Sequence, residues 1–204
     1  MTSTQLDAWL TADPAEADTK PDTAELAPPP PAPRRRGVVI EGGLGALGHL
    51  GDMKHVSPIS PSFRLQAGYE IFNWLLLSAQ GDLELSDTAY AHRPPDKRAY
   101  ALFGFGIGAR LGWQPWHVVG FHFQPEGGLS SVTDDVLSTY GYRDATRLRP
   151  FVGATIGVDW FQINPHYALG IYGGVRDYLQ TFERTYGSAP PLAWVSGVAL
   201  RYAL

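Results

Sequence analysis

Apolar and polar residues alternate with a period of two along most of residues 37–204, which is the pattern of β-strands with two different faces. The alternation recurs in eight segments of about 10 to 15 residues, each bounded by turn-forming residues. Long polar connections near residues 49–61, 86–98, 131–147 and 181–191 alternate with tight turns at 72–74, 114–117 and 162–165. The pattern predicts an all-β chain, an eight-stranded antiparallel up-and-down meander with its long loops at one end and both termini at the other.

The two faces of the expected strands differ in side-chain size. One face carries Phe, Leu, Trp, Tyr or Val at nearly every position, whereas the other carries the charged residues and most of the glycines. A narrow lumen filled by arginines and carboxylates needs glycines to leave room, whereas a water-facing exterior would favour long polar side chains. If roughly 35 to 40 apolar side chains faced water, each would forgo about 1.5–3 kcal/mol of burial. We therefore expect a transmembrane β-barrel whose apolar face contacts hydrocarbon, which strands of ~12 residues tilted by ~40° can span.

The inward face of this barrel is expected to hold six acidic and five basic residues. Because a buried charge is strongly unfavourable unless it is paired, this balance favours a lumen plugged by salt bridges. A narrow proton or ion path through the same charges is the alternative. The expected lumen charge network consists of Glu41, Arg64, Glu70, Asp82, Glu84, Arg110, Glu126, Arg149, Asp159, Arg176 and Arg201.

Aromatic residues cluster near the expected ends of the strands, where a membrane barrel has belts at its two headgroup levels. The belt toward the long loops is predicted to contain Tyr90, Tyr100, Tyr178 and Phe182. The belt at the short-turn end is predicted to contain Phe72, Trp74, Trp113, Trp116 and Trp160.

Composition excludes several other classes of protein. The chain has 204 residues, a net charge of −4 and no cysteine. The negative charge argues against nucleic acid as a partner, and the lack of cysteine excludes thiolate metal sites and disulfides. No segment approaches the ~18 consecutive apolar residues of a membrane-spanning helix. His49, His55 and His92 lack the spacing of a metal site, so neither a metal nor another cofactor is expected.

Residues 1–36 differ in composition from the rest of the chain. They contain no glycine, seven of the 17 prolines and six acidic residues. Such a segment buries too little apolar surface to offset its conformational entropy, and its proline run at 28–31 favours an extended spacer. We expect residues 1–36 to be a disordered tether and residues 37–204 to form the barrel. The segment lacks the basic and apolar regions of a signal peptide, so either the sequence is a mature form restarted with Met or the interpretation as an exported barrel is wrong.

Over residues 37–204 the chain resembles the small eight-stranded outer-membrane barrels of Gram-negative bacteria, the OmpA/OmpX-like group. The resemblance extends to the C-terminus, where Leu200, Tyr202 and Leu204 alternate as in the assembly signal of that family. Leu204 stands where the family usually has Phe or Trp. The resemblance implies insertion into outer-membrane lipid, with the long loops outside the cell and both termini in the periplasm, so that residues 1–36 would be a periplasmic tether. An envelope protein is expected to bind through residues 1–36 or through the long loops. It implies no substrate.

The leading functional hypothesis is a non-enzymatic outer-membrane barrel that acts as an anchor, a surface-recognition protein or a component of an envelope complex. A lipid-A-modifying enzyme is the catalytic alternative, but the expected lumen position of its histidine and the lack of a following His-x-Ser motif argue against it. Its candidate residues are His122, Glu126, Ser130 and Ser131. A soluble lipocalin-like carrier, with its apolar face inward, is the third hypothesis.

Overall fold

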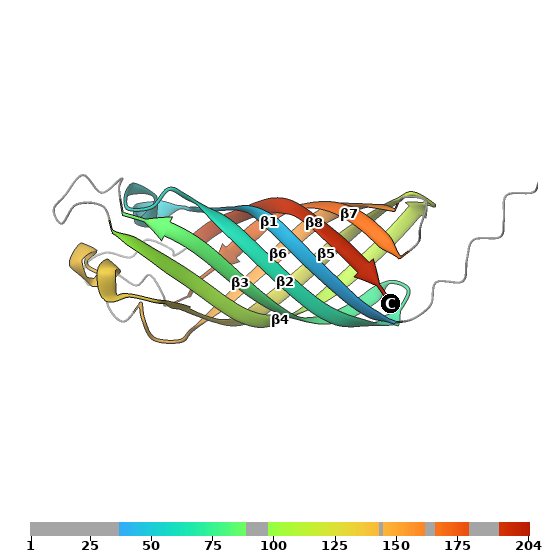
Figure 1. Ribbon diagram of the computed structural model, residues 1–204, viewed down its shortest axis with the longest axis horizontal. Helices are drawn as coiled ribbons and strands as arrows, with labels where there is room; N and C mark the ends of the chain where they lie inside the picture. Colours follow the sequence, from blue (N-terminus) through green and yellow to red (C-terminus); the bar gives the residue numbers. More distant parts are fainter. Residues whose placement is uncertain (1–36, 89–97, 143–144, 162–165, 180–191) are drawn as a thin grey trace, which may run out of the picture. The chain divides into compact units, whose positions relative to one another are not determined.

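The computed structural model describes residues 37–88, 98–142, 145–161, 166–179 and 192–204. Eight antiparallel strands form one closed barrel, in which each strand pairs with its neighbours along the chain and β8 pairs with β1 (Figure 1). The predicted eight-stranded up-and-down barrel is therefore confirmed. The strands are β1 (Val38–His49), β2 (Ile59–Phe72), β3 (Leu75–Asp87), β4 (Ala99–Trp116), β5 (Val119–Val132), β6 (Arg149–Phe161), β7 (Tyr167–Asp177) and β8 (Leu192–Ala203).

The turn between β4 and β5 differs from the prediction. The sequence pattern places this turn at residues 114–117, whereas β4 continues to Trp116 and the turn is formed by His117 and Val118. Pairing of β4 with β5 is irregular between Trp113 and Trp116. Pro115 lies in this irregular stretch, which is a position where a strand tolerates a residue without an N–H.

The apolar face of every strand lies on the outside of the barrel. Phe105, Leu169 and Leu200 keep 48%, 49% and 57% of their surface exposed, whereas Arg110 and Asp159 keep 5% each. This orientation confirms the predicted transmembrane barrel and is the reverse of what a soluble carrier requires. A closed barrel also pairs its backbone groups between strands and leaves no free sheet edge, as hydrocarbon demands.

Two of the long loops contain short 3₁₀ helices that the strand pattern does not predict. They are η2 (Gly51–His55) and η4 (Asp135–Tyr140). Met53 of η2 and Leu137 of η4 are buried at the loop end of the barrel. In the part of the chain that the structure describes, no helix is both long and apolar enough to cross a membrane.

Candidate functional site: the barrel lumen

The half of the lumen nearer the long loops holds two arginines and three carboxylates. Arg176 Nη2 donates to Glu126 Oε1 at 2.6 Å and to Asp82 Oδ2 at 3.2 Å. The Arg176 side chain is 1% exposed, so the surrounding protein replaces its hydration. Arg64 Nε donates to Asp82 Oδ1 at 2.8 Å, which links the second arginine to the same carboxylate. We call this group the loop-side cluster: Arg64, Asp82, Glu84, Glu126 and Arg176.

A second group of charges occupies the half of the lumen nearer the short turns. Arg110 donates from Nη1 and Nη2 to the two oxygens of Glu41, both at 2.7 Å, which is the bidentate geometry of a strong pair. His122 Nδ1 lies 3.1 Å from Asp159 Oδ2. We call this group the turn-side cluster: Glu41, Glu70, Arg110, His122, Asp159 and Arg201, in which Arg201 pairs with Glu70.

Glutamine side chains connect the two clusters. Arg110 Nε donates to Gln124 Oε1 at 2.9 Å, and Gln124 Nε2 donates to Gln80 Oε1 at 3.2 Å. Gln80 Nε2 in turn donates to Glu126 Oε2 at 2.9 Å, and Gln66 Nε2 donates to Gln124 Oε1 at 3.3 Å. Charges from both halves of the lumen therefore belong to one continuous hydrogen-bonded network.

Two glycines leave the space that the turn-side cluster occupies. A Cβ atom added at Gly157 would lie 2.5 Å from Cε1 of His122, and one added at Gly170 would lie 2.7 Å from Oδ1 of Asp159. Both distances are shorter than a van der Waals contact. The inward glycines of the sequence pattern thus have a physical role, because they make room for the side chains of neighbouring strands.

The loop end of the lumen is filled by apolar side chains rather than charges. The guanidinium of Arg176 lies over the ring of Phe151, with Cζ 4.5 Å from the ring centroid, so this apolar layer packs directly on the loop-side cluster. Tyr178 connects the layers, because its hydroxyl donates to Glu84 Oε1 at 3.0 Å. We call this layer the apolar plug: Leu47, Met53, Val56, Tyr100, Leu102, Val132, Leu137, Tyr142, Ala145, Phe151, Tyr178, Ala193 and Val195.

The prediction of an aromatic belt at the loop end is wrong for Tyr100 and Tyr178, because both residues belong to the apolar plug. Tyr100 is 4% exposed and Tyr178 is 1% exposed, so neither lies at a lipid headgroup level. Tyr100 occupies an inward position of β4, and Tyr178 turns into the lumen after β7 ends. Tyr90 and Phe182 lie outside the described residues. At the short-turn end, the residues predicted for a belt are all exposed on the outer wall: Phe72, Trp74, Trp113, Trp116 and Trp160.

Ten of the eleven charges expected in the lumen belong to the two clusters. The eleventh, Arg149, is half-buried at the start of β6, where its carbonyl oxygen accepts a hydrogen bond from Ser130 Oγ at 3.5 Å. Sequence reasoning missed the connecting role of Gln66, Gln80 and Gln124, although all three lie at inward positions of the alternating pattern.

The residues considered for catalysis do not converge. His122 contacts Asp159, and Ser131 Oγ donates to the carbonyl oxygen of Thr146 at 2.8 Å. His122 and Ser130 are eight residues apart on β5, which corresponds to about 26 Å at ~3.3 Å per residue. The described ranges also contain no group of three or more His, Asp or Glu residues that could hold a metal ion. His122 and Glu126 instead take part in the charge pairing of the lumen.

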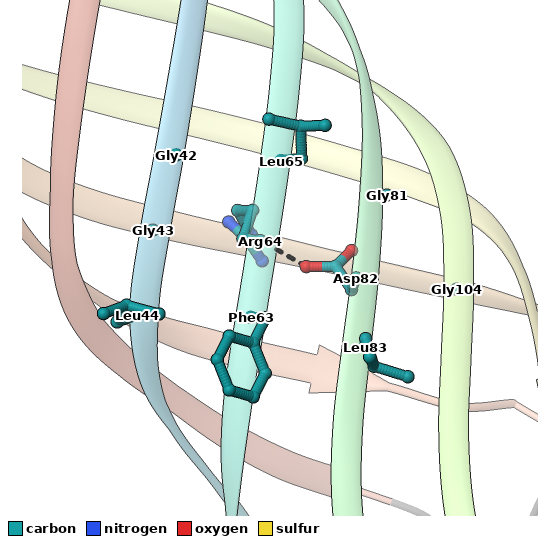
Figure 2. Close-up of a pocket in the computed structure, with 10 residues that line it drawn as sticks. All are labelled: Gly42, Gly43, Leu44, Phe63, Arg64, Leu65, Gly81, Asp82, Leu83 and Gly104. Carbon is teal, nitrogen blue, oxygen red and sulfur yellow. Dashed lines mark hydrogen bonds and ion pairs between the residues drawn. The ribbon is translucent and has the colours of Figure 1, made fainter.

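A shallow apolar hollow of about 550 Å³ lies on the outer wall and extends from β1 to β4. A Cβ atom added at its outward Gly42 would meet no heavy atom within 4 Å. Arg64 and Asp82 are directly opposite each other on β2 and β3, face the lumen side of this wall and are each 9% exposed, whereas the next residue on β2, Leu65, is 64% exposed on the outer side. Figure 2 shows this ion pair between β2 and β3, together with the apolar side chains around the hollow: Leu44, Phe63, Leu65 and Leu83.

The C-terminal residues lie at the short-turn end of the outer wall. Leu200 and Leu204 are exposed by 57% and 58%. Tyr202 is half-buried, and its ring centroid lies 4.8 Å from that of Tyr167 on β7. The end of β8 thus presents a mixed aromatic and aliphatic surface next to β1.

The barrel is similar to a solved neisserial protein, Neisserial surface protein A (NspA), with a TM-score of 0.60 and 12% identity over 82% of this chain and 97% of that one. The chain has the fold of the small outer-membrane β-barrels. Two further similar structures are Ail of Yersinia pestis (TM-score 0.48, 11% identity, 82% and 100% coverage) and OprG of Pseudomonas aeruginosa (0.47, 10%, 83% and 96%). No family model and no curated protein match the sequence.

Proposed function

We propose that this protein is a non-enzymatic outer-membrane barrel that acts as an anchor, a surface-recognition protein or a component of an envelope complex. The observation that carries the proposal is the pairing of a hydrocarbon-compatible exterior with a lumen filled from both halves by mutually paired charges. An open pore needs charges that face water, whereas Glu126 and Arg176 have side chains exposed by 0% and 1%. A closed barrel leaves the loops and the termini as the parts that contact partners.

The orientation follows from the same proposal. The long loops face the outside of the cell, and both termini lie on the periplasmic side, where Trp113 and Trp116 anchor the short-turn end at the headgroups. Leu200, Tyr202 and Leu204 serve as the assembly signal. Residues 1–36, which lie outside the described residues, serve in this proposal as a tether that contacts another envelope protein.

Planar-bilayer recording of the full chain tests the closed lumen. We expect no stable single-channel conductance, because solute would have to displace the buried ion pairs. Large, long-lived open levels would refute the closed barrel and would favour the ion-pore alternative. Heat-modifiable mobility in detergent gels must accompany the recording, since only a folded barrel gives an informative silent trace.

Affinity capture tests the partner. The full chain and a chain lacking residues 1–36 are expected to retain different envelope proteins. Identical partners for both chains would assign recognition to the barrel loops and remove the tether from the proposal. A chain in which residues 1–36 are shuffled at constant composition separates specific recognition from the effect of charge alone.

A further inference from the structure

The boundary between the loop-side cluster and the apolar plug is bridged by one tyrosine. The hydroxyl of Tyr178 donates to Glu84 Oε1 at 3.0 Å and accepts from Arg176 Nη1 at 3.4 Å. Its ring belongs to the plug and packs at 6.1 Å from the ring of Phe151. Tyr178 therefore contacts both layers, with its hydroxyl in the charged layer and its ring in the apolar layer.

The backbone around Tyr178 is not part of the barrel wall. β7 ends at Asp177, so Tyr178 follows the last residue that pairs with β6 and β8. The next residue, Leu179, has a φ of 21°, which is a left-handed conformation that is unfavourable for a residue with a side chain. Leu179 N donates to Asp177 Oδ1 at 3.0 Å and closes a tight turn around Tyr178. The residue with the unfavourable conformation therefore directly follows the residue whose ring is buried in the lumen.

Burial keeps the Tyr178 hydroxyl in its neutral, hydrogen-bonded form. Complete burial, reinforced by the neighbouring Glu84 carboxylate, raises the pKa of Tyr178 well above its ordinary value. The hydroxyl therefore remains a donor to Glu84 throughout the physiological pH range.

We propose that Tyr178 is a latch that closes the loop end of the lumen by fastening the apolar plug to Glu84 and Arg176. Because its backbone lies outside the strand ladder, Tyr178 can leave the lumen without breaking a strand pair. When Tyr178 leaves, the Glu84 carboxyl group becomes accessible to water. Water can then solvate Glu84 Oε2, which has no hydrogen-bond partner among the described residues in the closed state. The latch goes beyond the proposed function, because it specifies where a closed barrel opens.

Carboxyl labelling of the full-length barrel in detergent tests the latch. A water-soluble carbodiimide with a charged amine modifies accessible carboxylates, and mass spectrometry of the digested protein gives the modification rate at Glu84. The rate at Glu41, which lies in the turn-side cluster, is the internal reference. In the wild-type protein we expect slow modification at both positions, because their residues are 2% and 5% exposed.

Two variants at the latch should raise the rate at Glu84 and leave the rate at Glu41 unchanged. Tyr178→Phe keeps the ring and removes the hydroxyl, and it should raise the rate about tenfold, the factor that corresponds to ~1.4 kcal/mol of lost hydrogen bonding. Tyr178→Ala also removes the ring and should raise the rate further. Leu137→Ala, at a plug residue from η4 that is 0% exposed, is the matched control and should have little effect at Glu84.

An unchanged Glu84 rate in Tyr178→Phe would overturn the latch, and this variant decides the question even where Tyr178→Ala fails to fold. An equal increase in Leu137→Ala would also overturn it, because the plug would then loosen wherever volume is removed. The outcome is independent of the bilayer conductance, since the charge network below Glu84 remains in place in every variant.

Discussion

Arg176→Met removes a guanidinium from the most buried part of the lumen. The wild-type side chain is 1% exposed and contacts Glu126 at 2.6 Å and Asp82 at 3.2 Å. Its loss leaves the three carboxylates of the loop-side cluster with Arg64 alone, whose Nη1 lies 3.4 Å from Glu126 Oε2. Removing one partner of a buried pair costs about 3–5 kcal/mol, because the remaining charge keeps its desolvation penalty. We expect a loss of unfolding free energy in this range.

Arg201→Met is the matched comparison. Arg201 pairs with Glu70 near the short-turn end, and the two side chains are exposed by 12% and 19%, so water can replace part of the lost interaction. The expected loss is about 1 kcal/mol. Adding Glu126→Gln to Arg176→Met should restore part of the stability, because the uncompensated carboxylate is then neutral.

Reversible urea unfolding in lipid vesicles, followed by tryptophan fluorescence, measures these differences. The six tryptophans of the chain provide the signal without labelling. Equal losses for Arg176→Met and Arg201→Met would contradict the reasoning, because burial would then not determine the energetic weight of a lumen arginine.

Other positions test the wall and the lumen separately. Phe105→Arg places a charge on the lipid face and should cost about 2–4 kcal/mol near the bilayer midplane, seen as a smaller folded fraction on detergent gels, whereas Phe105→Leu should fold normally. Gly157→Ala forces a methyl group against a lumen histidine and should lower the unfolding free energy by about 1–3 kcal/mol. Gly42→Ala adds a methyl group to the hollow on the outer wall and should change the unfolding free energy by less than ~0.5 kcal/mol. A larger loss for Gly42→Ala than for Gly157→Ala would refute the conclusion that inward glycines make room for lumen side chains. Gln124→Leu should lower the unfolding free energy by about 1–3 kcal/mol, because Arg110 and Gln80 lose a hydrogen-bond partner. An unchanged urea midpoint would show that the hydrogen bonds of Gln124 do not contribute to stability.

The strands and their faces could be predicted from the sequence because each strand has one face in hydrocarbon and one in a crowded lumen. This difference produces an unbroken alternation such as Gly104-Phe105-Gly106-Ile107-Gly108, which no other regular structure explains as simply. The 3₁₀ helices could not be predicted, since Met53 and Leu137 are single buried residues in polar loops and form no periodic pattern.

The sequence does not show which charged side chains pair with each other in the lumen, and the reason is geometric. Strand register places Arg176 opposite Gly153 on β6 and Ala193 on β8, neither of which carries a charge. Its actual partners, Asp82 and Glu126, project across the lumen from β3 and β5. Such contacts depend on barrel closure and strand stagger, which the alternation of one strand does not encode.

The apolar plug was missed because alternation assigns a residue to a face without stating what that face contacts. Leu47 and Phe151 occupy inward positions, as the charges do, but they lie near the loop ends of β1 and β6. An inward position that changes from charged to apolar toward one end of several strands is the signal that could have revealed the plug.

The register of the barrel depends on the lumen more than on the wall. Outward leucines and phenylalanines still contact lipid tails after a slip of two residues, which keeps every side chain on its face, so they distinguish poorly between such alignments. A slip of β4 by one residue, however, would carry Arg110 from its two 2.7 Å contacts with Glu41 into hydrocarbon and place the bulky Leu111 in the lumen. A charge exposed to the bilayer interior costs about 2–4 kcal/mol, and the abandoned carboxylate adds its own penalty. The paired charges therefore specify the alignment of the strands as well as filling the space between them.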